Sequence, residues 1–118
     1  MTAQIGLSAP HKFELGKIHP GKVYDVGTMT IRNVGDEKGC FEMGVAQLQD
    51  QPELTVPKEW VIFEPSSACL EAGKNVVVKV KLRVKKPKKG NYFCYLEACM
   101  RGCVGTKLYF TLESGNSK

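Results

Sequence analysis

The segment VVVKVKLRV, residues 76–84, decides how the rest of the sequence is interpreted. From Val78 onward, aliphatic residues alternate one by one with Lys79, Lys81 and Arg83. Successive side chains of a β-strand point to opposite faces of its sheet, so a period of two separates two environments. The segment therefore predicts a strand with one buried apolar face and one solvated basic face.

The same pattern extends outward along the chain as short runs rich in β-branched and aromatic residues, divided by Gly, Pro and Asn. Further strands are predicted at residues 10–15, 23–34, 40–48, 60–63, 91–100 and 104–112, with a short edge strand at 54–56. Alternation predicts a single core that lies between two antiparallel sheets. The core residues are Val78, Val80, Leu82, Cys94 and Leu96. Asp25 and Gly27 interrupt the alternation, which indicates a β-bulge or a close backbone approach.

Length and composition limit the possible architectures. The chain has 118 residues, of which 42% are hydrophobic and 25% charged, and these values exclude a disordered chain and a membrane protein. We expect one domain over residues 1–118, with an ordered core over about 10–112 and a tail at 113–118. Many short strands without a convincing amphipathic helix predict an all-β fold. Its expected form is an immunoglobulin-like antiparallel β-sandwich of seven to eight strands.

Several turn and strand motifs carry a resemblance to a known superfamily. The stretches FELGKIHPG (13–21) and TMTIRNVG (28–35) resemble the opening of immunoglobulin-like domains of the major sperm protein and hydin-like group. The later stretches WVIFEP (60–65), PKKGNY (87–92) and TKLYFT (106–111) are similar to prokaryotic cell-surface members of that group. The resemblance implies a structural or protein-binding module without catalytic residues. This sequence differs from antibody domains, because Met29 and Ile31 occupy the second-strand positions at which an antibody domain would have a disulfide-forming cysteine.

Positive charge is concentrated in one part of the chain, whose formal net charge is +5. A basic strip of seven residues is formed by Lys79, Lys81, Arg83, Lys85, Lys86, Lys88 and Lys89. Such a strip could attract an anionic polymer such as a nucleic acid or an acidic glycan, or a membrane surface. The favoured interpretation is the solvated face of a strand that continues into a polar loop, with the lysines also discouraging edge-to-edge pairing. No aromatic residue interrupts it, so any polyanion binding is expected to be weak and non-specific.

The five cysteines allow several chemistries. Their odd number argues against a complete disulfide framework, and they are Cys40, Cys69, Cys94, Cys99 and Cys103. Cys94 is predicted to point into the core as a small apolar residue. Cys99 and Cys103 flank a three-residue connection and could form a disulfide across a hairpin in an oxidising compartment. Metal binding by Cys94, Cys99 and Cys103 is disfavoured, because alternation sends Cys94 and Cys99 to opposite faces.

The sequence contains few candidates for catalysis. His11 and His19 are the two histidines, and nothing in the local sequence pairs either with a cysteine nucleophile. Phosphate-loop and metalloprotease motifs are absent, so we predict no enzyme activity, no cofactor and no metal site. The predicted function is a non-catalytic structural or protein-interaction module of a larger surface protein or assembly. Its partner would be another protein or a neighbouring domain. The alternative is an anionic-polymer-binding module that uses the Lys79–Lys89 strip.

The sequence does not decide the compartment. The N-terminal stretch MTAQIGLSAPHKF has neither a basic region nor an apolar core, so no signal peptide is predicted. No apolar run approaches the roughly 20 residues that a membrane-spanning helix needs. We expect an extracytoplasmic location if the chain is a fragment, and a cytoplasmic one if Met1 is the native start.

Overall fold

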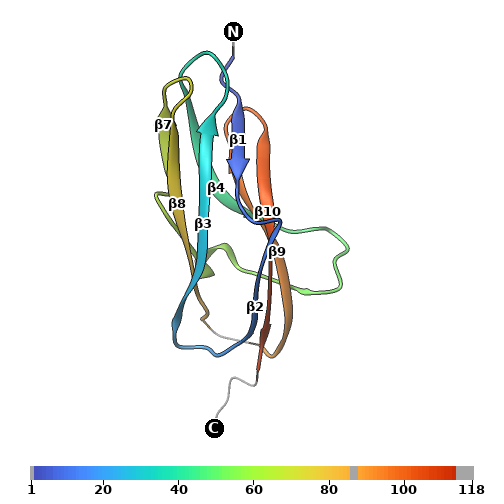
Figure 1. Ribbon diagram of the computed structural model, residues 1–118. Helices are drawn as coiled ribbons and strands as arrows, with labels where there is room; N and C mark the ends of the chain where they lie inside the picture. The colour runs from blue at the N-terminus through green and yellow to red at the C-terminus, as the bar shows by residue number, and fades with distance from the viewer. Residues whose placement is uncertain (1, 86–87, 114–118) are drawn as a thin grey trace.

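The computed structural model describes residues 2–85 and 88–113, which form ten β-strands and one short 3₁₀ turn (Figure 1). The first strands are β1 (Ile5–Ser8), β2 (Lys12–Ile18), β3 (Val23–Asn33), β4 (Gly39–Ala46) and β5 (Leu54–Thr55). The 3₁₀ turn (Lys58–Trp60) precedes β6 (Val61–Glu64), β7 (Ser67–Leu70), β8 (Asn75–Arg83), β9 (Gly90–Cys99) and β10 (Cys103–Leu112). No helix in the described part of the chain is long and apolar enough to cross a membrane.

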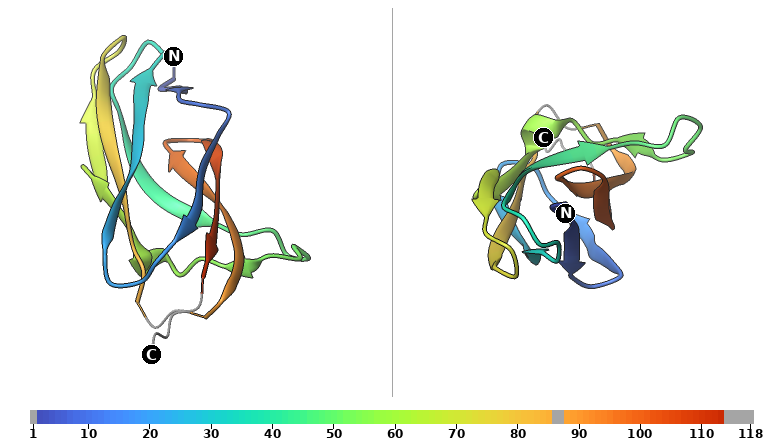
Figure 2. Two further views of the ribbon diagram at one scale, coloured as in Figure 1. Left: turned by 60° about the horizontal axis from the view of Figure 1, so that its bottom comes forward. Right: turned by 90° about the horizontal axis from the view of Figure 1, so that it is seen from above.

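The strands form two sheets that face each other (Figure 2). The four-stranded sheet has the order β1-β3-β8-β6, and the other has the order β2-β10-β9-β4-β7, with β5 paired to β9. Neighbouring strands are antiparallel except in the β2–β10 and β5–β9 pairs, which are parallel. The prediction of an all-β immunoglobulin-like sandwich is confirmed. The described residues form ten strands where seven to eight were expected, because two short strands, β1 and β7, add to the predicted set.

Strand β8 has the two faces that its sequence predicts. Val78, Val80 and Leu82 are each 0% exposed, whereas Lys79 and Arg83 are exposed on the opposite face. Residues from the facing sheet complete the core, and among these Cys94, Leu96 and Leu108 are fully buried. The predicted core is therefore confirmed.

The N-terminal segment differs from the expectation. Residues 5–8 form β1, which pairs with β3 in the four-stranded sheet, before the chain crosses to the other sheet as β2. The buried hydroxyl of Thr106 donates at the crossing, lying 2.6 Å from the carbonyl oxygen of Pro10 and 2.8 Å from that of His11. The predicted strand at 10–15 accordingly begins at Lys12 and continues to Ile18.

The interruption at Asp25 and Gly27 has the predicted physical cause. The register between β3 and β8 shifts at these residues, and Gly27 adopts a φ of 147°. A Cβ atom at Gly27 would lie 2.7 Å from Cε1 of Phe13, so a side chain there would collide with the core. Both the bulge and the close approach are confirmed.

The side chain of Asn33, at the end of β3, joins three separate segments. Asn33 is 0% exposed, and its Nδ2 donates to the carbonyl oxygens of Glu37 (2.6 Å) and Leu70 (3.0 Å). Its Oδ1 accepts from the backbone N–H groups of Gln4 (3.3 Å) and Gly35 (3.0 Å). Since β3 and β7 belong to different sheets, this one amide connects the two layers at their end.

The substitution Asn33→Ala should lower the free energy of unfolding by about 2–4 kcal/mol, because it leaves several buried backbone groups without partners. Urea denaturation measures this change. The matched control is Asn75→Ala, at an exposed position in β8, which should shift stability by less than about 0.5 kcal/mol. Equal losses in the two variants would show that Asn33 does not hold the layers together.

Candidate functional site

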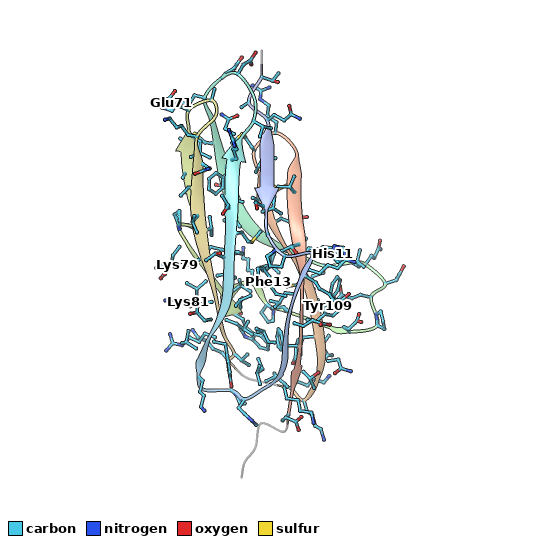
Figure 3. All side chains as sticks on the ribbon, in the orientation of Figure 1. His11, Phe13, Glu71, Lys79, Lys81 and Tyr109 are labelled. Atoms are coloured by element: carbon cyan, nitrogen blue, oxygen red, sulfur yellow. A yellow bond between two sulfur atoms is a disulfide. The ribbon has the colours of Figure 1, made fainter. Side chains whose placement is uncertain are left out.

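The predicted basic strip divides between a strand and the connection that follows it. Lys79, Lys81 and Arg83 lie on the outer face of β8, and Figure 3 shows Lys79 and Lys81 pointing away from the sandwich. Lys85, Lys88 and Lys89 follow the strand and are exposed. Lys86 lies outside the described residues.

Strand β3 lies beside β8 and contributes further side chains to the same outer surface. We define the β3–β8 face as the outer surface formed by Thr28, Thr30, Arg32, Val77, Lys79, Lys81 and Arg83. Register pairing places Val77 beside Thr30 and Lys79 beside Thr28. A small apolar and hydroxyl-bearing centre therefore lies among the cationic side chains.

Acidic residues lower the positive charge at one end of this face. Strand pairing places Asp25 beside Lys81 on β3, and Glu64 beside Lys79 on β6. The Nζ atom of Lys81 lies 3.6 Å from Oε1 of Glu64. Among the residues that the structure describes, Arg32, Lys79 and Arg83 make no such ion pair. Three cations thus stay available to a partner.

The apolar centre of the face is unusually open to solvent. Val77 is 51% exposed on the outer face of β8, where it pairs with Thr30 of β3 and lies beyond the end of the β6–β8 pairing. Val23, opposite Arg83, is 53% exposed, and Val34, directly after β3, is 51% exposed. Three of the four large exposed hydrophobic residues found in the described ranges therefore lie on this face or at its end.

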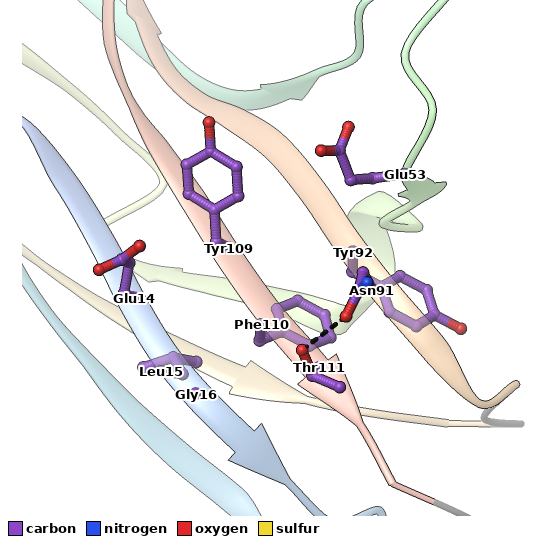
Figure 4. A pocket seen from close by; sticks show the side chains of 9 residues that line it. All are labelled: Glu14, Leu15, Gly16, Glu53, Asn91, Tyr92, Tyr109, Phe110 and Thr111. Carbon is purple, nitrogen blue, oxygen red and sulfur yellow. Dashed lines mark hydrogen bonds between the residues drawn. The ribbon is translucent and has the colours of Figure 1, made fainter.

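The other sheet carries a shallow groove on its outer surface (Figure 4). Its volume is about 550 Å³, and Glu14 and Glu53 lie on opposite sides of Tyr109. The Nζ atom of Lys12 lies 3.3 Å from Oε2 of Glu14 and 5.8 Å from the centre of the Tyr109 ring. At the groove's end, the Thr111 hydroxyl lies 2.8 Å from Oδ1 of Asn91. Glu14 is paired with Lys12, and none of the large exposed hydrophobic residues of the described ranges lines the groove, so the β3–β8 face is the stronger candidate.

Four of the five cysteines pair on the outer face of the same sheet. Cys99 lies opposite Cys103 in the β9–β10 ladder, and the two form a disulfide. Cys40 and Cys69 form a second disulfide across β4 and β7, which the sequence analysis missed. Their register could not be deduced, because 29 positions separate them in sequence.

Cys94 is buried and free, on the opposite face of β9 from Cys99. Burial raises the pKa of the Cys94 thiol from 9.0 to about 12. A thiol with this pKa is a poor nucleophile at neutral pH. His11 and His19 are exposed, and neither makes a hydrogen bond to a cysteine among the described residues.

Comparisons with known proteins identify the architecture. No protein-family model matches the sequence, and no curated protein matches it. A PapD-like (ASH) domain of human CEP192 superposes with a TM-score of 0.60 at 12% identity, over 95% of this chain and 87% of that one. The chain has a PapD-like fold.

Further matches belong to larger chains. The Salmonella enterica SafA pilin in complex with the SafB chaperone gives a TM-score of 0.60 at 12% identity, over 99% of this chain and 58% of that one. A family 123 glycoside hydrolase from Clostridium perfringens gives 0.63 at 7% identity, over 95% of this chain and 27% of that one. At these identities the likeness establishes the immunoglobulin-like PapD-type fold alone.

The thiol of Cys94 should make stability depend on pH in the alkaline range. The folded chain retains the thiol proton up to a pH of about 12, whereas the unfolded chain releases it above about 9. Stability should therefore fall as pH rises above 9, with a slope of up to about 1.4 kcal/mol per pH unit. Denaturant unfolding of the wild type and of Cys94→Ala measures this. Parallel pH profiles above pH 9 would contradict the assignment.

Proposed function

We propose that this domain is a non-catalytic protein-interaction module of a larger surface protein or assembly. Its β3–β8 face binds an acidic segment of another protein or of a neighbouring domain. The observation that carries the proposal is Val77, a half-exposed apolar residue on the outer face of β8. It lies near Lys79 and Arg32, which make no ion pair among the described residues.

The composition of the face suits a protein partner. Protein interfaces have an apolar core with a polar rim, and charged residues are depleted at the core. Val77, Thr28 and Thr30 supply such a core, Arg32 and Lys79 flank it, and Arg83 lies farther along β8. The three rim cations favour an acidic partner, because complementary charge accelerates association and fixes orientation.

The same arrangement disfavours the anionic-polymer alternative. A polyanion presents a continuous row of negative charges, and the carboxylates of Asp25 and Glu64 lie within the basic rows of this face. Their repulsion would reduce the gain from each neutralised phosphate or sulfate. An acidic peptide can place its charges selectively beside Arg32, Lys79 and Arg83.

The structural matches support a protein partner in general terms. One match is a chaperone solved together with a pilin, and another is a chaperone in a pre-assembly complex with a tip adhesion subunit from Acinetobacter baumannii. Chains with this fold are thus found in complexes with other proteins. The narrower relation to major sperm protein and hydin-like domains remains part of the proposal, supported by the turn and strand motifs.

Site-specific photocrosslinking tests this function. A photoreactive residue at position 77 should capture a protein partner in native cells, and Lys79→Glu should lower the yield by about fivefold or more, the effect of ~1 kcal/mol at an interface. The matched control is the same probe at Leu48, which is 50% exposed in the projecting segment between β4 and β5.

Two outcomes would overturn the proposal. Equal crosslinking from positions 77 and 48 would show that the face is not selective. Crosslinks at position 77 that disappear after nuclease or glycosidase treatment would favour the anionic polymer instead.

A further inference from the structure

A second group of chemically reactive side chains lies far from the β3–β8 face, at one end of the six-stranded sheet. Cys99 stands between Cys103 on β10 and Glu42 on β4, in one row of paired residues. The Cys40–Cys69 pair lies on the same outer face. A groove of about 500 Å³ runs beside Cys40, Cys69 and Cys99 and includes Glu42 and Met100. This end of the sheet is therefore rich in sulfur and accessible from solvent.

Glu97 directs a carboxylate toward the Cys99–Cys103 pair. It precedes Cys99 by two residues on β9, so both side chains project from the same face. The Oε1 atom of Glu97 lies 3.9 Å from Sγ of Cys99. Ligand atoms of Glu97, Cys99 and Cys103 all lie within 4.8 Å of one another.

The residue opposite Glu97 leaves space for this arrangement. Glu97 pairs with Gly105 on β10. A Cβ atom at Gly105 would lie 3.4 Å from Cγ of Glu97 and 2.6 Å from the carbonyl oxygen of Leu96. A side chain at position 105 would therefore collide with the backbone of Leu96 and would contact Glu97, whereas glycine leaves the Glu97 side chain unobstructed.

We propose that reduction of the Cys99–Cys103 disulfide creates a site for a divalent cation of the zinc class. The thiolates of Cys99 and Cys103 and the carboxylate of Glu97 are its three protein ligands. Zinc-class ions accept sulfur and carboxylate ligands and tolerate three protein ligands with an open fourth position. Soft thiolate donors select such ions over magnesium and calcium.

Cys99 and Cys103 can form a disulfide or bind a metal ion as two thiolates, but they cannot do both at the same time. A small dithiol reduces the disulfide by two electrons, becomes a cyclic disulfide itself, and leaves Cys99 and Cys103 as thiols. Binding of one divalent cation then forms two metal–sulfur bonds and releases two protons. A two-electron oxidant such as hydrogen peroxide would convert the two thiolates to the disulfide, take up two protons and be reduced to water, and this would release the ion. Cys103 is exposed, so a small reductant can reach this pair.

The other cysteines do not share this arrangement. Cys94 is 0% exposed and lies on the inner face of β9, out of reach of Glu97. Among the described residues, the group of metal-ligand atoms within 4.8 Å does not include Cys40 or Cys69. The site is therefore specific to the β9–β10 hairpin.

Cobalt(II) titration of the full chain tests the proposal. After reduction with a phosphine, the protein should bind one equivalent of Co²⁺ with a thiolate-to-cobalt charge-transfer band. Zinc should displace the cobalt, and the oxidised protein should show no band. C40S/C69S should retain the band, whereas C99S/C103S should lose it. E97Q should weaken binding by at least the roughly 10–100-fold caused by loss of an outer-shell partner.

The matched control for E97Q is E14Q, which removes an exposed carboxylate from the same sheet face. E14Q should leave cobalt affinity unchanged. No band in the reduced wild type, a band that persists in C99S/C103S, or equal losses in E97Q and E14Q would each overturn the proposal. Loss of the β-sheet circular-dichroism signal on reduction, without a band, would overturn it as well.

Discussion

The register between β3 and β8 is the constraint on which both faces of the four-stranded sheet depend. Burial of Val78, Val80 and Leu82 forces the residues between them into solvent. A slip of one residue would bury Lys79 and Lys81 and expose the aliphatic row, at a cost of many kcal/mol. The core therefore determines the composition of the candidate binding face. The outward orientation of the cations and of Val77 results from the same pairing of β3 with β8.

Two buried polar side chains connect segments that belong to different sheets. Asn33 connects the end of β3 with the carbonyl of Leu70 in the other sheet. Thr106 of β10 binds the backbone of Pro10 and His11, where the chain passes from one sheet to the other. Both side chains satisfy backbone groups that strand pairing leaves open. Buried polar groups paired in this way favour one arrangement of the strands over its alternatives.

Structural features that depend on a few neighbouring residues could be predicted from the sequence. Features that depend on how distant strands align with one another could not. The alternation in β8 and the irregularity at Gly27 are visible within a few residues. Strand β1 has four residues, too few for a periodic signal. The Cys40–Cys69 pairing depends on how β4 aligns with β7. Alternation predicted that Lys79, Lys81 and Arg83 share the outer face of β8, but Asp25 and Glu64 join them only through pairing with other strands.

The central claim is that one register divides the β8 side chains between the core and a docking face. Solvent paramagnetic relaxation of the methyl groups, measured in the free chain and in its native assembly, tests this claim most directly. In the free chain, the Val77 methyls should relax strongly, whereas the methyls of Val78 and Val80 should be protected. In the assembly, Val77 should become protected while Leu48 remains accessible. Relaxed Val78 and Val80 methyls, or a Val77 that stays accessible in the assembly, would contradict the account.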